Sequence, residues 1–337
     1  MKISFPNVRM LQEAKDAQML KCRHTGKPPL SVGREILYFF IVFLISLVAQ
    51  SAIITPFQTV AIMRSDEFMA LIKTPTLNYQ EIMNTVNRLL AALPDWFMAI
   101  QLFSTSATIA ACFVYCRLIE KRSWVSLGFA KKGAVTEYAA GLGIGLALFA
   151  SAVLICMATG QVTLSVNAAP AVGMIILYFV GYMIQGMSEE ILCRSYLMVS
   201  IQRGNPLWVA VLTNALLFTS LHIANPGITP LALVNLTLFG IFASLYTLRR
   251  GSIWGIGAIH TIWNFAQGNL FGISVSGMGG SPSILQATLT EGGSLMHGGA
   301  FGMEGGIAVT VVLTLGCVAM LVCQTKKSEI VEISPAV

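Results

Sequence analysis

Two adjacent glutamates and an arginine interrupt a stretch of the chain that is otherwise almost entirely apolar. Glu189 and Glu190 are followed by Arg194, one helical turn after the second acid. An ionisable side chain at the centre of a membrane helix costs about 2.5 to 3.5 kcal/mol even on insertion scales, so such acids usually mark a site. A carboxylate in a pocket of low dielectric can take a proton from water and return it later, as a general base does. Glu189 is the candidate base, and Arg194 can ion-pair with Glu190.

Two further polar pairs lie on later apolar segments. Phe218 and His222 are four residues apart on one segment, and His260 and Asn264 are four apart on another. Residues with this spacing share a helix face. His222 could hold or polarise a water molecule. His260 and Asn264 could donate hydrogen bonds to an oxyanion that develops on a peptide carbonyl.

The composition requires a membrane environment for these faces. Of 337 residues, 55% are hydrophobic and 11% are charged, and the mean hydropathy is +0.73. Segments of about 20 apolar residues can cross a bilayer as helices. We therefore predict an all-α polytopic membrane protein with about eight transmembrane helices. The predicted spans are Glu35 to Ile54, Trp96 to Leu118, Tyr138 to Ala158, Ala171 to about Met198, Pro206 to His222, Ile228 to Leu248, Ile253 to Phe271 and Ile307 to Cys323.

The basic residues predict the orientation of these spans. Lys and Arg concentrate in the N-terminal arm, after the last span, and in the connections after the second, fourth and sixth spans. The other side has only Arg64, Lys73 and Arg88. By the positive-inside rule, both termini are then cytoplasmic. The net charge of +6 follows from this anchoring to the lipid bilayer and needs no nucleic-acid partner.

The chain divides into a terminal arm, one membrane domain and a tail. We predict a cytoplasmic arm over residues 1–34, a single transmembrane domain over 35–325 and a cytoplasmic tail over 326–337. Residues 272–306 contain eleven glycines and no Lys or Arg, which favours an external loop without regular structure, a linker rather than a substrate gate. The stretch from Asn78 to Leu93 has an apolar stripe at helical spacing and predicts an amphipathic helix on the outer membrane surface.

The polar faces can meet at one depth. Glu190 and His222 lie about equally far from the turn at Gly204 when each helix rises about 1.5 Å per residue. The same count from the turn at Gly251 places Asn264 level with them and His260 lower. A site one helical turn tall, toward the membrane interior, is expected.

The residues resemble the CPBP family of intramembrane endopeptidases, which includes CAAX prenyl proteases and bacterial proteins linked to bacteriocin self-immunity. Its motifs EExxxR, FxxxH and HxxxN are similar to residues 189–194, 218–222 and 260–264, in that order. Each motif alone is short, but three in order on separate apolar spans are specific. The resemblance extends over about Lys121 to Gln267 and forms the CPBP-like core of the membrane domain.

This resemblance implies a role for each motif residue. Glu189 would be the general base for the attacking water, supported by Glu190 and His222. His260 and Asn264 would form the oxyanion site. The implied reaction is hydrolysis of a peptide bond in a membrane-associated peptide or protein.

Arg194 and Phe218 complete the motifs as supporting residues. The interpretation favoured here requires no cofactor. The family is often labelled a metalloprotease, and two carboxylates with two histidines could bind zinc, although no HExxH pair is present. The metal ligands would then be Glu189, Glu190, His222 and His260.

Other functions stay open at this stage. A non-catalytic bacteriocin-immunity or peptide-binding protein could keep the same fold, and acids with histidines at mid-membrane also occur in proton-coupled transporters. The chain shows no inverted repeat, which disfavours the transporter. Short cytoplasmic loops put prenylated CAAX substrates in doubt and favour a bacterial plasma membrane.

Overall fold

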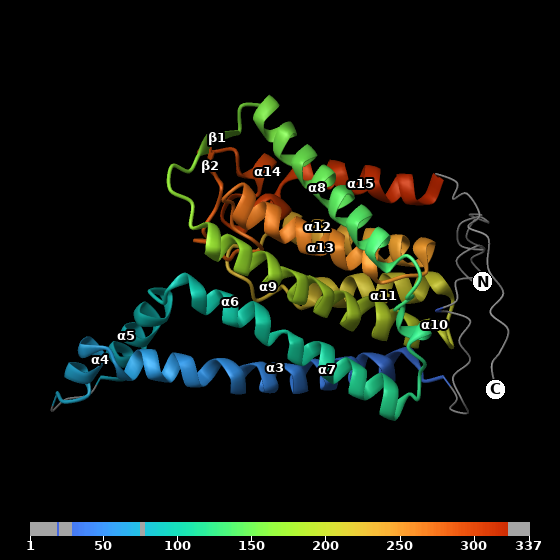
Figure 1. The fold of residues 1–337 in the computed structure, drawn as a ribbon, viewed down its shortest axis with the longest axis horizontal. Coiled ribbons are helices and arrows are strands. Elements are labelled where there is room, and N and C mark those ends of the chain that lie inside the picture. The colour runs from blue at the N-terminus through green and yellow to red at the C-terminus, as the bar shows by residue number, and fades with distance from the viewer. Residues whose placement is uncertain (1–18, 20–28, 75–77, 323–337) are drawn as a thin grey trace.

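Helices account for most of the chain in a computed structural model, which describes Met19 and residues 29–74 and 78–322 (Figure 1). The protein is an all-α polytopic membrane protein. The predicted N-terminal arm lies largely, and the predicted tail at 326–337 entirely, outside the described residues. The helices are α3 (Val32–Met63), α4 (Asp66–Leu71), α5 (Tyr79–Ala91), α6 (Asp95–Ser104), α7 (Ser106–Val114), α8 (Ala134–Ala158), α9 (Val172–Glu190), α10 (Val199–Gln202), α11 (Leu207–Ser220), α12 (Pro230–Arg250), α13 (Trp254–Phe265), α14 (Ser294–His297) and α15 (Ile307–Val322). Short 3₁₀ and π segments connect or extend them: η1 (Tyr115–Ile119), η2 (Val125–Leu127), η3 (Ile191–Met198), η4 (Ala266–Leu270), η5 (Gly299–Phe301) and η6 (Met303–Gly305).

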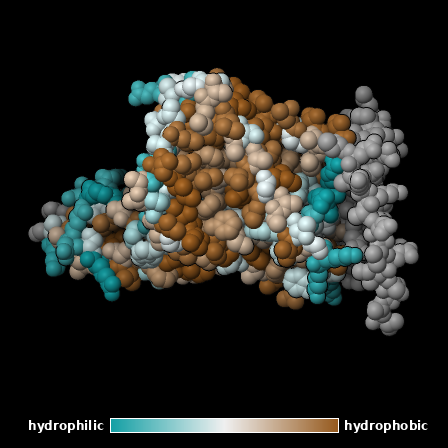
Figure 2. Space-filling model, turned by 45° about the horizontal axis from the view of Figure 1, so that its top comes forward, coloured by the Kyte–Doolittle hydropathy of each residue, from teal (hydrophilic) through white to brown (hydrophobic). Residues whose placement is uncertain are grey.

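Each of the eight predicted spans coincides with helical structure in the described part of the chain. Among the described residues, five helical stretches are long and apolar enough to cross a membrane by themselves, and α11 and α15 are shorter apolar helices. The five stretches are Val32–Met63, Asp95–Ile119, Ala134–Ala158, Val172–Gln202 and Pro230–Arg250. Figure 2 shows a broad apolar face with hydrophilic residues gathered toward its two ends, as a bilayer requires.

The helices that carry the motifs form a tight bundle. In Figure 1, α3, α6 and α7 lie along one side, and α8 to α15 form the bundle beside them. Helix α13 packs between α8 and α9. Two glycines allow these close approaches, because a Cβ on Gly145 of α8 would lie 2.4 Å from Ile262 and one on Gly186 of α9 would lie 2.9 Å from the backbone nitrogen of Thr261. Small residues at such contacts are typical of membrane helix packing.

The basic connections gather at one end of the molecule, and α4, α5 and the strands lie at the other end (Figure 1). At the basic end, Arg250 forms an ion pair with Glu137. The backbone nitrogen of Ile253 donates to the carbonyl of Gly128 at the same end. The basic residues therefore concentrate at one end of the bundle along the helix axes. The assignment of the basic end to the cytoplasm stays a prediction.

The same end contains a buried polar group, here called the Glu120 cluster, made of Glu120, Arg122, Ser200 and Arg203. Arg122 is 1% exposed and lies 3.2 Å from the Glu120 carboxylate. The hydroxyl of Ser200 donates to Glu120 at 2.8 Å, and Arg203 lies 3.4 Å from the same acid. The Arg122 guanidinium also donates to backbone carbonyls of η3, 2.5 Å to that of Ser195 and 3.3 Å to that of Tyr196. This cluster joins the connection before α8 to the end of the α9–η3–α10 helix.

The glycine-rich segment is more ordered than the sequence indicated. It contains β2 (Leu285–Leu289), which pairs antiparallel with β1 (Val162–Val166), and also α14, η5 and η6. Phe301 is fully buried. The expectation of a loop without regular structure is therefore wrong. Its partner strand lies more than 100 residues earlier, so local composition gave no sign of the pairing.

The predicted helix from Asn78 to Leu93 is confirmed as α5. The side chain of Asn78 caps it by accepting from the backbone nitrogen of Gln80 at 3.0 Å. Its position on the outer membrane surface stays a prediction.

Candidate active site

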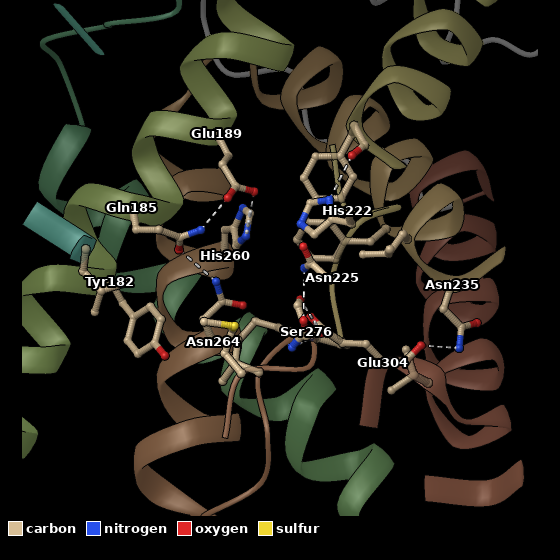
Figure 3. Close-up of a pocket in the computed structure, with 18 of the residues that line it drawn as sticks. Tyr182, Gln185, Glu189, His222, Asn225, Asn235, His260, Asn264, Ser276 and Glu304 are labelled. Atoms are coloured by element: carbon tan, nitrogen blue, oxygen red, sulfur yellow. Dashed lines mark hydrogen bonds and ion pairs between the residues drawn. The ribbon is translucent and has the colours of Figure 1, made fainter. Parts of the chain in front are cut away.

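A cavity of about 180 Å³ lies among the motif helices. It is bordered by α6, α9, α11, α12, α13 and α15, and by the glycine-rich segment (Figure 3). Its volume equals that of several water molecules or a few side chains. The polar residues that line it are Tyr182, Gln185, Glu189, His222, Asn225, Asn235, His260, Asn264, Ser276, Ser281 and Glu304. Residues from all three motifs therefore border one space together with residues that no motif contains, whereas Glu190 and Arg194 do not line it.

The two adjacent acids occupy different surroundings. Glu190 is fully buried, and its carboxylate lies 3.1 Å from Arg194, as the spacing predicted. The Arg194 guanidinium lies 4.7 Å from the centre of the Phe218 ring, which adds a cation–π contact. Glu189 borders the cavity, and its side chain is 23% exposed. One acid is thus held in a structural ion pair, and the other faces the space where a substrate can enter.

His260 connects the two acids. Its Nδ1 lies 2.8 Å from Oε1 of Glu190, and its Nε2 lies 3.7 Å from Oε2 of Glu189. Because the carboxylate of Glu190 is paired with Arg194 and accepts hydrogen bonds, Nδ1 of His260 carries a proton. Phe239 packs against the edge of the ring, with centroids 5.1 Å apart. The imidazole is therefore held in one orientation, with Nε2 beside Glu189.

Gln185 is a site residue that the sequence analysis did not identify. Its amide nitrogen donates to Oε1 of Glu189 at 2.5 Å, and its amide oxygen accepts from Asn264 at 2.9 Å (Figure 3). Gln185 thereby connects the first motif to the third. The signal was present, because Gln185 lies one helical turn before Glu189 on an apolar helix.

His222 approaches the cavity from the opposite side. In Figure 3 it lies across the space from Glu189 and His260. Its Nδ1 lies 2.9 Å from the backbone carbonyl of Phe218. A carbonyl oxygen can only accept, so Nδ1 is the protonated nitrogen, and Nε2 of the neutral ring is left as an acceptor. Among the described residues, no hydrogen bond or ion pair joins His222 to Glu189 or His260.

The order of depth differs from the count along straight helices. His260, not Asn264, lies against the acids, and Asn264 lies one turn further along, beside Gln185. The prediction that Asn264 is level with the acids and His260 lower is wrong. The helix after Glu190 is the π segment η3. A π turn holds more residues than an α turn, so Glu190 lies closer to the basic end than an α-helical count places it.

The four residues considered as zinc ligands do not form a ligand set as they lie. Among the described residues, no group of three or more His, Cys, Asp and Glu side chains is arranged to hold a metal ion. His222 faces the other acceptors across the cavity, and Nδ1 of His260 is hydrogen-bonded to Glu190.

A comparison with protein families finds a match in the middle of the chain. Residues 169–266 match the family model described as type II CAAX prenyl endopeptidase Rce1-like. The resemblance to CPBP intramembrane proteases is confirmed there. The match includes all three motifs and begins at residue 169, so the earlier part of the predicted core, from Lys121, lies outside it. Neither a search of curated proteins nor a search of solved structures found a match.

The match and the apolar helices together support an intramembrane protease of the CAAX type, an integral membrane protein that acts on a membrane-embedded peptide or protein.

Proposed function

We propose that this protein is an endopeptidase that hydrolyses a peptide bond of a membrane-associated peptide or protein, with Glu189 as the general base. The observation that carries this proposal is the difference between the adjacent acids. Glu189 borders the cavity and its side chain is 23% exposed, whereas Glu190 is fully buried. Oε2 of each acid accepts no hydrogen bond among the described residues, and Oε1 of Glu189 is held by Gln185. A carboxylate that is fixed on one side and free on the other is suited to bind and deprotonate water.

In the proposed reaction, water binds between Glu189 and His222. The Glu189 carboxylate takes a proton as the water oxygen bonds to the carbonyl carbon of the substrate, and the carbonyl electrons move to oxygen. The resulting oxyanion is stabilised by donors on the cavity wall. Collapse of this intermediate breaks the C–N bond, and Glu189 returns its proton to the leaving amine. Water is consumed and two peptide ends are formed.

The oxyanion donors are His260 and Asn264. Both border the cavity, and both are mostly buried, where a hydrogen bond to a charged group is strong. The amide nitrogen of Asn264 uses one hydrogen on Gln185 and has a second available. His260 donates from Nε2 when its ring is protonated. Glu190 and Arg194 hold the histidine and do not touch the substrate.

The test is Glu189→Gln in the purified protein. Glutamine keeps the shape and the bond to Gln185 but cannot accept the proton, so turnover should fall by about 10² or more while the protein folds. Glu291→Gln, the same change at an exposed residue of the glycine-rich segment, is the matched control. Turnover that survives in Glu189→Gln contradicts the assignment. Wild-type protein that binds peptides without cleaving them points to the peptide-binding alternative.

Metal dependence is decided by the same assay. We expect activity to survive a chelator, because the proposed base and donors are all side chains of this protein. Loss of activity with a chelator, restoration by zinc, and stoichiometric zinc that is absent from His222→Ala would replace this mechanism with a metal-dependent one.

We also propose that the basic end of the bundle faces the cytoplasm and that the membrane is a bacterial plasma membrane. The first follows from the distribution of Lys and Arg, and the second from the short connections at that end.

A further inference from the structure

The cavity contains a second carboxylate that the proposed chemistry does not use. Glu304 comes from η6 in the glycine-rich segment, borders the cavity and is 8% exposed. The backbone nitrogen and the hydroxyl of Ser276 both donate to its Oε2, at 2.9 and 2.7 Å (Figure 3). Among the described residues, Oε1 accepts no hydrogen bond.

The surroundings of Glu304 supply two hydrogen-bond donors to one of its oxygens but, among the described residues, no cation. A buried carboxylate normally requires an opposite charge as well. No Lys or Arg lines the cavity, and no ion pair to Glu304 occurs among the described residues. His222 borders the same space, but Asn225 and Ser276 lie between it and Glu304 in Figure 3.

A structural role does not require this charge. The backbone of the segment is held by the Asn235 side chain, which donates to the carbonyl of Glu304 at 2.8 Å and to that of Gly306 at 2.9 Å. The Ser276 turn is held by Asn225, which donates to its carbonyl at 3.0 Å. A neutral glutamine at position 304 could accept the same two bonds from Ser276. The negative charge is therefore left for a ligand in the cavity.

We propose that Glu304 is a specificity-determining residue that binds a cationic group of the substrate, a Lys or Arg side chain close to the bond that is cleaved. This inference rests on the proposed endopeptidase function. Glu189 and Glu304 border one small cavity, so a residue bound by Glu304 lies within a short reach of the reacting carbonyl. The two acids also disfavour a substrate that places a terminal carboxylate in this space. The substrate class is a membrane-associated peptide with a basic residue beside the scissile bond.

Binding can be measured without cleavage in the Glu189→Gln protein, reconstituted in lipid nanodiscs. The probes are an uncharged apolar peptide with a single Lys placed at successive positions and a matched series with Gln at the same positions. At one position, Lys should bind roughly 10- to 100-fold more tightly than Gln, the range for hydrogen bonds to charged groups. Adding Glu304→Gln should remove this preference. Adding Glu291→Gln should leave it unchanged.

Two controls separate charge from structure. Ser276→Ala removes one hydrogen bond to Glu304 and keeps its charge, so the preference for Lys should persist. Acetylation of the peptide Lys removes the cation without altering the protein, so it should abolish the preference even if Glu304→Gln does not fold. Equal binding of Lys and Gln peptides at every position overturns the proposal. Equal weakening of both series by Glu304→Gln also overturns it, because that result is what a structural role produces.

Cleavage by the wild-type protein distinguishes this proposal from the one on which it rests. If the wild-type protein cleaves none of the peptides but still shows a Lys preference that depends on Glu304, the endopeptidase function is contradicted and the cation site is supported. If Lys and Gln peptides are cleaved at equal rates, the endopeptidase function is supported and the cation site is contradicted.

Discussion

In the described part of the chain, the bundle buries carboxylates with arginines in two regions, and the cavity described above lies beside one of them. In the Glu120 cluster, the acid and its oxygens are taken up by Arg122, Ser200 and Arg203. In the candidate active site, Glu190 is paired in the same way with Arg194, but its neighbour Glu189 lines the cavity. In both regions, burying the charged side chains costs desolvation free energy.

The difference between the two regions shows which buried charged side chain is a candidate catalytic group. Burial and an arginine partner are common to both regions, so neither one identifies a catalytic group. The distinguishing feature is the cavity beside Glu189, because an oxygen without a partner also occurs on the buried Glu190. By this feature the Glu120 cluster is a structural joint, and the Glu189 region is a place where a reaction can occur.

The largest expected effect is on stability, in the Glu120 cluster. Arg122→Ala leaves Glu120 without its closest charge and removes donors from the carbonyls of η3, so the free energy of unfolding should fall by about 3 to 5 kcal/mol. Thermal denaturation in detergent measures the loss. Lys132→Ala, at an exposed residue, is the control with the same change of charge. Turnover per folded molecule should change little. An Arg122→Ala variant that is stable but inactive would contradict the division into a structural Glu120 cluster and a catalytic Glu189 region.

A smaller effect on stability and a large effect on rate are expected for Asn264→Ala. If its amide donates to the oxyanion only in the transition state, kcat should fall by about 10² to 10³ with little change in KM. The protein should unfold at nearly the wild-type temperature. A rise in KM at constant kcat would mean that Asn264 holds the substrate and not the oxyanion.

The smallest of these effects is expected for Gln185→Ala. Gln185 touches Glu189 and Asn264 and is expected to act through them, so kcat should fall by about tenfold, within the range of a lost hydrogen bond. Gln185→Glu is informative as a second variant, because it places a second acid beside Glu189 and should shift the pH–rate profile. An unchanged profile in Gln185→Glu together with full activity in Gln185→Ala would remove Gln185 from the site.

The sequence alone predicts the helices and the motif residues because both depend on short spacings. The apolar runs were long enough to define each span, and the i,i+4 pair of Glu190 and Arg194 forms the predicted ion pair. Asn78 caps α5 for the same local reason.

What the sequence could not predict depends on distant partners. Glu304 reaches the cavity because Asn235, some 70 residues earlier, holds its backbone. The strand β2 forms because β1 lies beside it. The relative depth of His260 and Asn264 depended on η3, and nothing in the apolar pattern of Ile191–Met198 separates a π turn from an α turn.

The π segment also couples the two regions through rotation. In an α-helix each residue turns the face by about 100°. Residues before η3 direct Glu189 and Glu190 toward the cavity and His260, and residues within and after it present Ser195, Tyr196 and Ser200 to the Glu120 cluster. If all eight residues of Ile191–Met198 became α-helical, each would turn the helix further than a π residue does, and one end would rotate against the other. Such a chain could keep its catalytic face or its structural joint in register, but not both.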